Sequence, residues 1–103
     1  MANLPQMTVQ TLKVLNALMD HPPSGLSGAD IAKTTRLASG TLYPILARLE
    51  RFGLLESEWE DVDPTEVQRP RKRLYRVTAV GDASRRTSLQ ELLPERGELT
   101  WAS

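Results

Sequence analysis

The sequence predicts a single, mainly α-helical domain with one small β-hairpin, and three observations lead to this fold class. Apolar residues recur at helical spacing in segments before Gly53, two alternating segments then flank a polar stretch, and a last helical segment ends before Pro94. The length of 103 residues fits one domain of ordinary size. Hydrophobic residues make up 40% of the chain and charged residues 25%, which is typical of a folded globular protein.

The first two helices are predicted from periodicity and capping residues. Residues 8–20 form the first helix, with Thr8 able to cap its start. The apolar residues at helical spacing in this segment are Val9, Leu12, Leu15, Leu18 and Met19. A turn follows at residues 22–25, and Ser27 with Asp30 then resembles a capping box. We therefore expect a short second helix over about residues 28–34.

The third helix is expected over about residues 39–52. Proline is tolerated in the first turn of a helix, so Pro44 indicates a start near Ser39 to Thr41, and Gly53 is placed to end the helix with a left-handed cap. One side of this helix is apolar and is expected to face the core: Leu42, Ile45, Leu46, Leu49 and Phe52.

The opposite side of the third helix has the shape that a nucleic-acid groove requires. It presents Gly40, Tyr43, Pro44, Ala47 and Arg51, with Arg48 at the flank. The side chains near its N-terminal end are small, and bulky ones would hold the helix away from the base edges. This pattern favours a recognition helix that lies in a DNA groove.

Residues after Gly53 predict a hairpin and a final helix. Residues 54–60 begin to alternate and residues 74–78 alternate clearly, while residues 61–71 are polar and are read as the connecting loop. Three helices followed by a two-stranded hairpin is the order of a winged helix-turn-helix. We assign residues 1–78 to this DNA-binding domain, with the wing at about 54–78, and residues 79–103 to a C-terminal helix and tail that dimerises. The last helix is expected to run from about residue 78 or 79 to Leu93.

Charges are separated along the chain although the net charge is zero. Acidic residues concentrate in residues 56–63, and four cations crowd into residues 69–73: Arg69, Arg71, Lys72 and Arg73. We expect one face of the protein to be basic on this account. Because four cations without an acid among them repel one another, they favour contact with backbone phosphates over a merely charged turn.

The composition argues against an enzyme. Cysteine is absent, and the single histidine, His21, lies beside two prolines, so no Ser-His-Asp set or metal site is supported. No glycine-rich phosphate loop is found. We expect no catalytic residue, no metal and no cofactor. The apolar runs are too short for a membrane span, the N-terminus does not resemble a secretory signal, and the lack of cysteine suits the cytoplasm.

Several motifs together resemble the PadR family of bacterial transcriptional regulators. The resemblance rests on Gly-Thr-Leu-Tyr-Pro-Ile-Leu-Ala-Arg-Leu-Glu at residues 40–50, Gly-Leu-Leu at 53–55, Glu-Trp-Glu at 58–60 and Arg-Pro-Arg-Lys-Arg at 69–73, followed by Tyr-Arg-Val-Thr at 75–78 and Gly81. It covers about residues 8–85. The chain departs from the family pattern in having Gln68 where the wing usually has glycine, in its Leu-Ser-Gly-Ala-Asp sequence at residues 26–30, and in a short C-terminal part without a clear effector pocket.

The resemblance implies a repressor, and the residues predict two sets of contacts. A chain with one recognition helix usually dimerises to place two helices in successive major grooves, so we expect a homodimer on a palindromic operator. The expected DNA-binding residues are Ser39, Gly40, Thr41, Tyr43, Pro44, Ala47, Arg48, Arg51, Arg69, Arg71, Lys72 and Arg73. The expected dimerisation residues are Leu12, Leu15, Met19, Val80, Leu89, Leu92 and Leu93, because the first and last helices carry more leucines than the core should need.

The sequence leaves alternatives open at several places. Tyr43 is favoured as a DNA contact over a half-buried packing residue, whereas Arg48 and Arg51 are equally compatible with phosphate contact and with ion pairs on a solvated face. Trp59 is interpreted as a core or wing-base residue, and the role of Trp101 is undecided. The rival function is a winged-helix module that binds a protein partner, as an adaptor or anti-repressor. The operator and any small-molecule effector are not determined.

Overall fold

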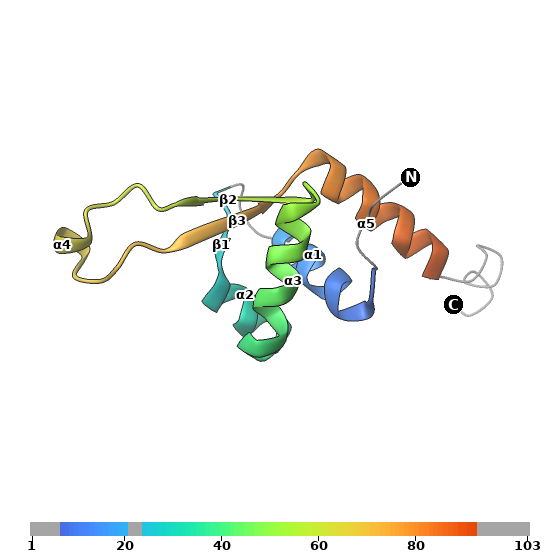
Figure 1. Ribbon diagram of the computed structural model, residues 1–103, viewed down its shortest axis with the longest axis horizontal. Coiled ribbons are helices and arrows are strands. Elements are labelled where there is room, and N and C mark those ends of the chain that lie inside the picture. The colour runs from blue at the N-terminus through green and yellow to red at the C-terminus, as the bar shows by residue number, and fades with distance from the viewer. Residues whose placement is uncertain (1–6, 21–23, 93–103) are drawn as a thin grey trace.

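The computed structural model describes residues 7–20 and 24–92 of the chain (Figure 1). Its elements are α1 (Val9–Met19), β1 (Leu26–Ser27), α2 (Gly28–Thr35), α3 (Ser39–Arg51), β2 (Leu55–Trp59), α4 (Pro64–Val67), β3 (Arg73–Val77) and α5 (Ala79–Leu92). The mainly α fold with a small β-sheet is the predicted fold class. None of the helices in this described part is long and apolar enough to cross a membrane.

The first two helices begin at the residues that the caps predicted. The Thr8 hydroxyl accepts the Thr11 backbone N–H at 3.1 Å, and the Ser27 hydroxyl accepts the Asp30 N–H at 3.2 Å. The Ser27 hydroxyl also donates to the Asp30 carboxylate at 3.0 Å, so the pair closes the start of α2. The observed ends lie within a residue of the expected ones, and the start of α2 is fixed firmly next to α3.

The third helix, α3, starts at Ser39, as expected, but Pro44 does not lie in its first turn. Pro44 is the sixth residue of α3, so the hydrogen bond that residue 44 would donate to the Gly40 carbonyl is missing. The helix tolerates this because Gly40 and Pro44 both lie on its exposed side. Phe52 forms the C-cap, and Gly53 follows with a φ of 80°, the left-handed conformation that the sequence predicted.

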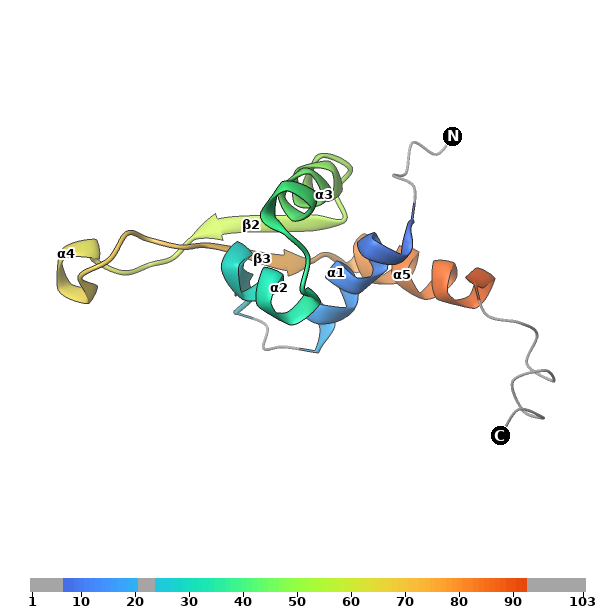
Figure 2. The ribbon, with the colours of Figure 1, turned by 90° about the horizontal axis from the view of Figure 1, so that it is seen from below.

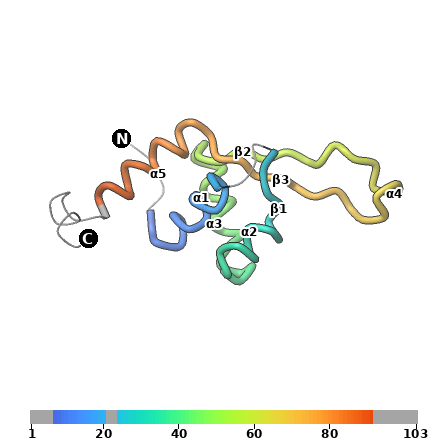
Figure 3. Tube along the Cα trace, turned by 180° about the vertical axis from the view of Figure 1, so that it is seen from behind, coloured from blue at the N-terminus to red at the C-terminus, as the bar shows by residue number. Residues whose placement is uncertain are grey.

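The sheet has three strands rather than the two of the expected hairpin. All neighbours are antiparallel, in the order β1-β3-β2 (Figure 3). Tyr75, in the central strand β3, lies opposite both Leu26 of β1 and Ser57 of β2. The two-residue strand β1 thereby ties the start of α2 to the base of the wing.

The wing loop contains a short helix where the sequence indicated only a polar loop. Helix α4 lies at the tip of the wing, far from the other helices in Figure 1. The Asp63 carboxylate caps it by accepting the Thr65 N–H at 2.9 Å, and Pro64 occupies its first position, where no donor is needed. Its C-cap is Gln68, with a φ of 58°. This is a left-handed conformation in which glycine is favoured.

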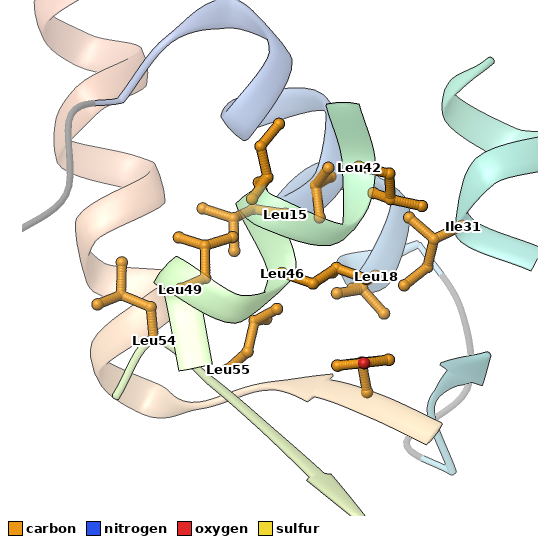
Figure 4. Close-up of a cluster of buried hydrophobic side chains, with 11 residues drawn as sticks. Leu15, Leu18, Ile31, Leu42, Leu46, Leu49, Leu54 and Leu55 are labelled. Atoms are coloured by element: carbon orange, nitrogen blue, oxygen red, sulfur yellow. The ribbon is translucent and has the colours of Figure 1, made fainter. Parts of the chain in front are cut away.

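The hydrophobic core lies between α1, α2, α3 and the strands (Figure 4). The predicted apolar side of α3 faces it: Leu42, Ile45, Leu46 and Leu49 are at most 4% exposed. Leu12 and Leu15 of α1 are 4% and 0% exposed within one chain. The expectation that Leu12 and Leu15 contact a second chain in a dimer is therefore wrong, because both side chains are buried within a single chain.

Helix α5 starts directly after β3 and packs beside α1 (Figures 1 and 3). Gly81 allows α5 to approach Leu54, which lies between α3 and β2, because a Cβ built on Gly81 would lie 2.9 Å from the Leu54 carbonyl carbon. The Arg85 guanidinium holds the two helices together by donating to Asn16 of α1 at 3.0 Å and to Asp82 at 2.9 Å. Leu93, Pro94, Trp101 and the side chain of Leu92 lie outside the described residues.

Candidate nucleic-acid interface

The outer side of α3 forms an exposed surface of small residues around one tyrosine. Gly40, Pro44 and Ala47 are exposed, and Tyr43 is 46% exposed. In Figure 2, which looks nearly along the axis of α3, this helix lies at the edge of the molecule beside β2. The sequence predicted this separation of an apolar and a small, polar side, and the structure brings the predicted residues together on one surface.

The N-terminal end of α3 has free backbone donors. Its N-cap is Ala38, whose side chain cannot accept a hydrogen bond, and Ser39 is exposed at the first position while Thr41 is partly buried. Unsatisfied N–H groups at a helix start carry the positive end of the helix dipole and suit an anion. A Cβ built on Gly40 meets no atom within 4 Å, so packing within the chain does not require glycine there.

Arg48 and Arg51, near the end of α3, form no ion pair within the described residues. Arg51 lies over the ring of Phe52, with its guanidinium carbon 5.6 Å from the ring centre. Glu50, the acid that could have paired with them, instead accepts a 2.6 Å hydrogen bond from the Ser57 hydroxyl of β2. Of the two alternatives, the structure favours arginines that are available to an external anion.

Tyr43 packs against the first residue of α2. A Cβ built on Gly28 would lie 2.8 Å from two ring carbons of Tyr43, closer than van der Waals contact allows. The ring of Tyr43 therefore needs a glycine at position 28. It is both a half-buried packing residue and a partly exposed one, so the two interpretations of the sequence are compatible.

Acidic and basic residues of the wing form ion pairs across its two strands. The acids of β2 and the cations of β3 are far apart in the sequence, but the antiparallel register places them side by side. Arg76 pairs with Glu58 at 3.0 Å and lies 3.6 Å from Glu56, across the two strands. The charge of Arg76 is thus offset by two acids of the neighbouring strand.

Two of the four predicted wing cations are engaged at the turn. The Arg69 guanidinium donates to both carboxylate oxygens of Glu60, at 2.7 and 3.0 Å, and Arg71 donates to the Val62 carbonyl at 2.9 Å. The hydrogen bond from Arg69, together with one from the Lys72 backbone N–H, lowers the pKa of Glu60 from 4.5 to about 2. The Lys72 side chain is exposed and forms no ion pair in the part of the chain that the structure describes.

Arg73 connects the wing to α3 instead of projecting freely. It donates to the Ser57 hydroxyl at 2.9 Å and lies 3.7 Å from the Glu50 carboxylate. Its guanidinium carbon also lies 5.2 Å from the ring centre of Trp59. Trp59 was predicted to lie in the core or at the base of the wing. It is 59% exposed, so the core location is wrong, and it packs on the wing through a cation–π contact with Arg73.

The sequence analysis missed four residues that shape this surface: Gly28, Glu50, Ser57 and Glu60. Glu50 and Ser57 fix the angle between α3 and the wing, and Glu60 holds the wing turn closed. No spacing signal reveals such pairs, because their partners are set by the register of β2 and β3. Only Gly28, as a glycine at the first position of a capped helix, gave a sequence signal.

The remaining dimerisation residues lie on α1 and α5. Met19 is 41% exposed, Val80 is 55% exposed and Leu89 is partly buried. They differ in this from Leu12 and Leu15, which the single chain buries. These three residues leave apolar surface on the helices α1 and α5, which lie next to each other (Figure 3).

Comparison with known proteins agrees with this architecture. The model of the PadR-like family of transcriptional regulators matches residues 14–87. The transcriptional regulator Rv3488 of Mycobacterium tuberculosis is 44% identical over 63 residues, which are 58% of this chain and 54% of that protein. The chain thus spans about half the length of this relative.

Solved structures share the fold. A PadR family regulator from Eggerthella lenta is 30% identical, with a TM-score of 0.63 over 79% of this chain and 69% of that one. A PadR family regulator from Clostridium difficile has the same fold at 24% identity, with a TM-score of 0.68 over 82% of this chain and 86% of that one. PadR-like proteins are transcription regulators rather than enzymes. The chain belongs to the PadR-like family of transcriptional regulators.

Proposed function

We propose that this regulator binds double-stranded DNA in a sequence-specific manner, as a homodimer on a palindromic operator, and represses transcription there. Its place of action is then the cytoplasm, where a bacterial chromosome lies. The observation that carries the proposal is the outer side of α3, where small exposed residues surround Tyr43. They lie next to two arginines, Arg48 and Arg51, that form no ion pair within the described residues. A helix of this shape can approach base edges closely, and cations at its flank can contact phosphates.

The residues of α3 take different tasks in this proposal. Ser39 and the free N–H groups of the first turn bind a phosphate at the positive end of the helix dipole. Gly40, Pro44 and Ala47 permit the close approach. Thr41 and Tyr43 hydrogen-bond to bases or to the backbone, and Arg48 and Arg51 contact the flanking strand.

The wing contributes phosphate contacts mainly through Lys72 and Arg71. Within the described residues Lys72 has no ion pair, and the only hydrogen bond of the Arg71 guanidinium is to the Val62 carbonyl. Neither cation must therefore give up a bond to a carboxylate in order to reach DNA. Arg69 and Arg73 are bonded to acids, and we assign them the task of holding the wing in place. Arg69 and Arg73 can still contact a DNA phosphate while they keep these bonds.

The dimer contact is proposed on the side of α1 and α5. Residues 79–103 contribute α5 to it, and Met19, Val80 and Leu89 are the apolar residues that remain partly or fully exposed there. A homodimer places two α3 helices about 34 Å apart, the spacing of successive major grooves. Sedimentation of the protein at micromolar concentration, alone and with bound duplex, tests this; a monomer under both conditions contradicts the dimer.

The test of DNA binding is the selection of a duplex from a random pool, followed by titration at several salt concentrations. Counterion release predicts that the logarithm of the binding constant falls linearly with the logarithm of the salt concentration. The double variant Lys72→Gln, Arg71→Gln should weaken binding to selected and scrambled duplexes alike and flatten this slope by about two, one for each lost phosphate contact. The matched control Lys13→Gln, on α1, should leave the slope unchanged.

The rival function, a winged-helix module for a protein partner, gives a different result in this experiment. Such a module enriches no sequence from the pool, and any weak association with DNA shows no preference between duplexes. Enrichment of a palindrome favours DNA binding. A lack of enrichment contradicts it.

A further inference from the structure

A cavity of about 210 Å³ lies beside the recognition helix, between α2 and β3. It is bounded by residues 27–29 at the start of α2, by Tyr43 of α3, and by Lys72, Arg73 and Tyr75 at the start of β3. This volume is about seven times the ~30 Å³ that a water molecule occupies in the liquid. We call it the α2–β3 cavity. It is large enough for a small polar group together with a few water molecules.

The Tyr75 hydroxyl is the least expected feature of this cavity. Tyr75 is only 9% exposed, and its hydroxyl has no hydrogen-bond partner among the described residues. In this part of the chain, every fully buried polar atom of a side chain has a hydrogen-bond partner. Because the Tyr75 hydroxyl has none, it must be accessible to solvent, and we infer that it is reached through the cavity that Tyr75 lines. Burial raises the pKa of Tyr75, so the hydroxyl remains protonated and can donate.

The groups around the cavity suit a negative charge. The Ser27 hydroxyl accepts the Asp30 N–H and donates to the Asp30 carboxylate. Residues 28–29 lie in the first turn of α2, whose N–H groups have no partner within the helix. Lys72 adds a cation without an ion pair in the described ranges. The nearby carboxylates are occupied: Asp30 accepts the Ser27 hydroxyl, and Glu50 is bonded to Ser57 and Arg73 on β2 and β3.

We propose that the α2–β3 cavity binds one phosphate of the DNA backbone, with the Tyr75 hydroxyl and the first turn of α2 as donors and Lys72 as the compensating charge. This proposal rests on the proposed DNA binding and adds a contact from outside α3. Tyr43 lies on Gly28 at the mouth of the cavity, next to the exposed side of α3. A phosphate in the cavity would therefore fix the depth at which α3 enters the groove. The ring of Tyr75 packs in the hydrophobic core, and this contact gives its hydroxyl a function as well.

The test uses Tyr75→Phe in the full chain, with the duplex selected by the wild-type protein. The thermal midpoint should stay unchanged, because the hydroxyl has no protein partner to lose. The dissociation constant should rise about tenfold, as expected for one hydrogen bond to a charged group. Lys72→Gln should lower affinity similarly, and Lys13→Gln, an exposed lysine on α1 that does not line this cavity, should not.

Neutral methylphosphonate linkages, placed one at a time along the duplex, locate the contact. At one position in each half-site, neutralisation should cost the wild-type protein about tenfold in affinity and the Tyr75→Phe variant about twofold or less. Linkages elsewhere should affect both proteins equally. This pattern supports the proposal, because the two changes remove the same interaction.

Three results would overturn the proposal, and they differ in whether they also contradict the proposed DNA binding. Wild-type affinity and an unchanged methylphosphonate profile for Tyr75→Phe overturn the phosphate contact but leave DNA binding intact. Failure of the wild-type protein to enrich any duplex overturns both. Inorganic phosphate at millimolar concentration that shifts the NMR signals of Tyr75 and Ala29, combined with an unchanged DNA profile, assigns the cavity to a small phosphate compound instead of DNA.

Discussion

Replacing Gly28 by alanine should displace Tyr43 from its position on α2. The added Cβ would lie 2.8 Å from two ring carbons, whereas carbon atoms in contact prefer about 3.5–4.0 Å, so the ring must move by about 0.7–1.2 Å. Overpacking of this kind costs about 1–3 kcal/mol in buried sites. Because the Tyr43 ring is 46% exposed and can swing outward, we expect the lower end, about 1 kcal/mol, or a thermal midpoint about 4–8 °C lower.

The effect of Gly28→Ala on DNA binding should be larger than its effect on stability. If Tyr43 contacts the duplex, a shift of its hydroxyl by this distance breaks a hydrogen bond and raises the dissociation constant about tenfold. Thermal melting and fluorescence anisotropy with the selected duplex measure the two effects. The double variant Gly28→Ala, Tyr43→Ala is the control, since removal of the ring should abolish the stability loss caused by the added methyl group.

An unchanged ring environment would refute this reasoning. If the NMR signals of the Tyr43 ring in Gly28→Ala equal those of the wild type, the ring does not pack on residue 28. A stability loss of the same size in the Tyr43→Ala background would mean that the methyl group strains the backbone of α2 instead.

Three further variants test other parts of the structure. Gln68→Gly should stabilise the wing by about 0.5–1 kcal/mol in a denaturant titration, because residue 68 has a left-handed φ of 58°; a loss of stability would contradict this backbone conformation. The pKa of Glu60 is lowered to about 2. The bond between Glu60 and Arg69 therefore stabilises the folded state above about pH 4.5, and this stabilisation is lost as the pH falls towards 2. NMR signals of the wing tip should report the transition in the wild type but not in Glu60→Gln. Gly81→Ala should lower the free energy of unfolding by about 3 kcal/mol or more and release α5, because the new methyl group overlaps the Leu54 carbonyl. A melting curve like that of the wild type would show that α5 packs differently.

The helices α1, α2 and α3 were predictable because each carries its own signals. The apolar period in residues 39–52, the Ser27 cap and Gly53 gave the bounds of α2 and α3 to within one residue. The chemistry of the α3 surface followed from the same period, since the side opposite the leucines had to be exposed. Local signals of this kind need no knowledge of the remaining chain.

The sheet and the wing contacts depend on pairings between distant residues. Strand β1 has two residues, too few to show an alternating pattern, and it exists because Leu26 lies opposite Tyr75. The acids and cations of the wing looked separated in the sequence, and only the antiparallel register brings Glu60 to Arg69. The helix α4 is a single turn, and its cap at Asp63 was hidden in a stretch that reads as a polar loop.

The spare leucines of α1 were misjudged for a related reason. A three-helix core was expected to need fewer apolar residues than the first and last helices offer. In the structure α1 is covered by α2, by β3 and by α5 as well, so Leu12 and Leu15 are buried on several sides. The buried fraction of a helix surface depends on how many other elements pack around the helix. The hydrophobic period of α1 alone does not reveal how many elements these are.

The most direct measurement of the central claim is the preference of Ala47→Leu for the selected duplex over a scrambled one. Ala47 is exposed on the outer side of α3, and leucine keeps the helix propensity and the charge, so the thermal midpoint should remain close to that of the wild type. The longer side chain should hold α3 out of the groove. We expect that the preference disappears and that only weak, salt-sensitive association through the wing remains. A folded Ala47→Leu protein that prefers the selected duplex as strongly as the wild type would contradict it and show that another surface reads the DNA.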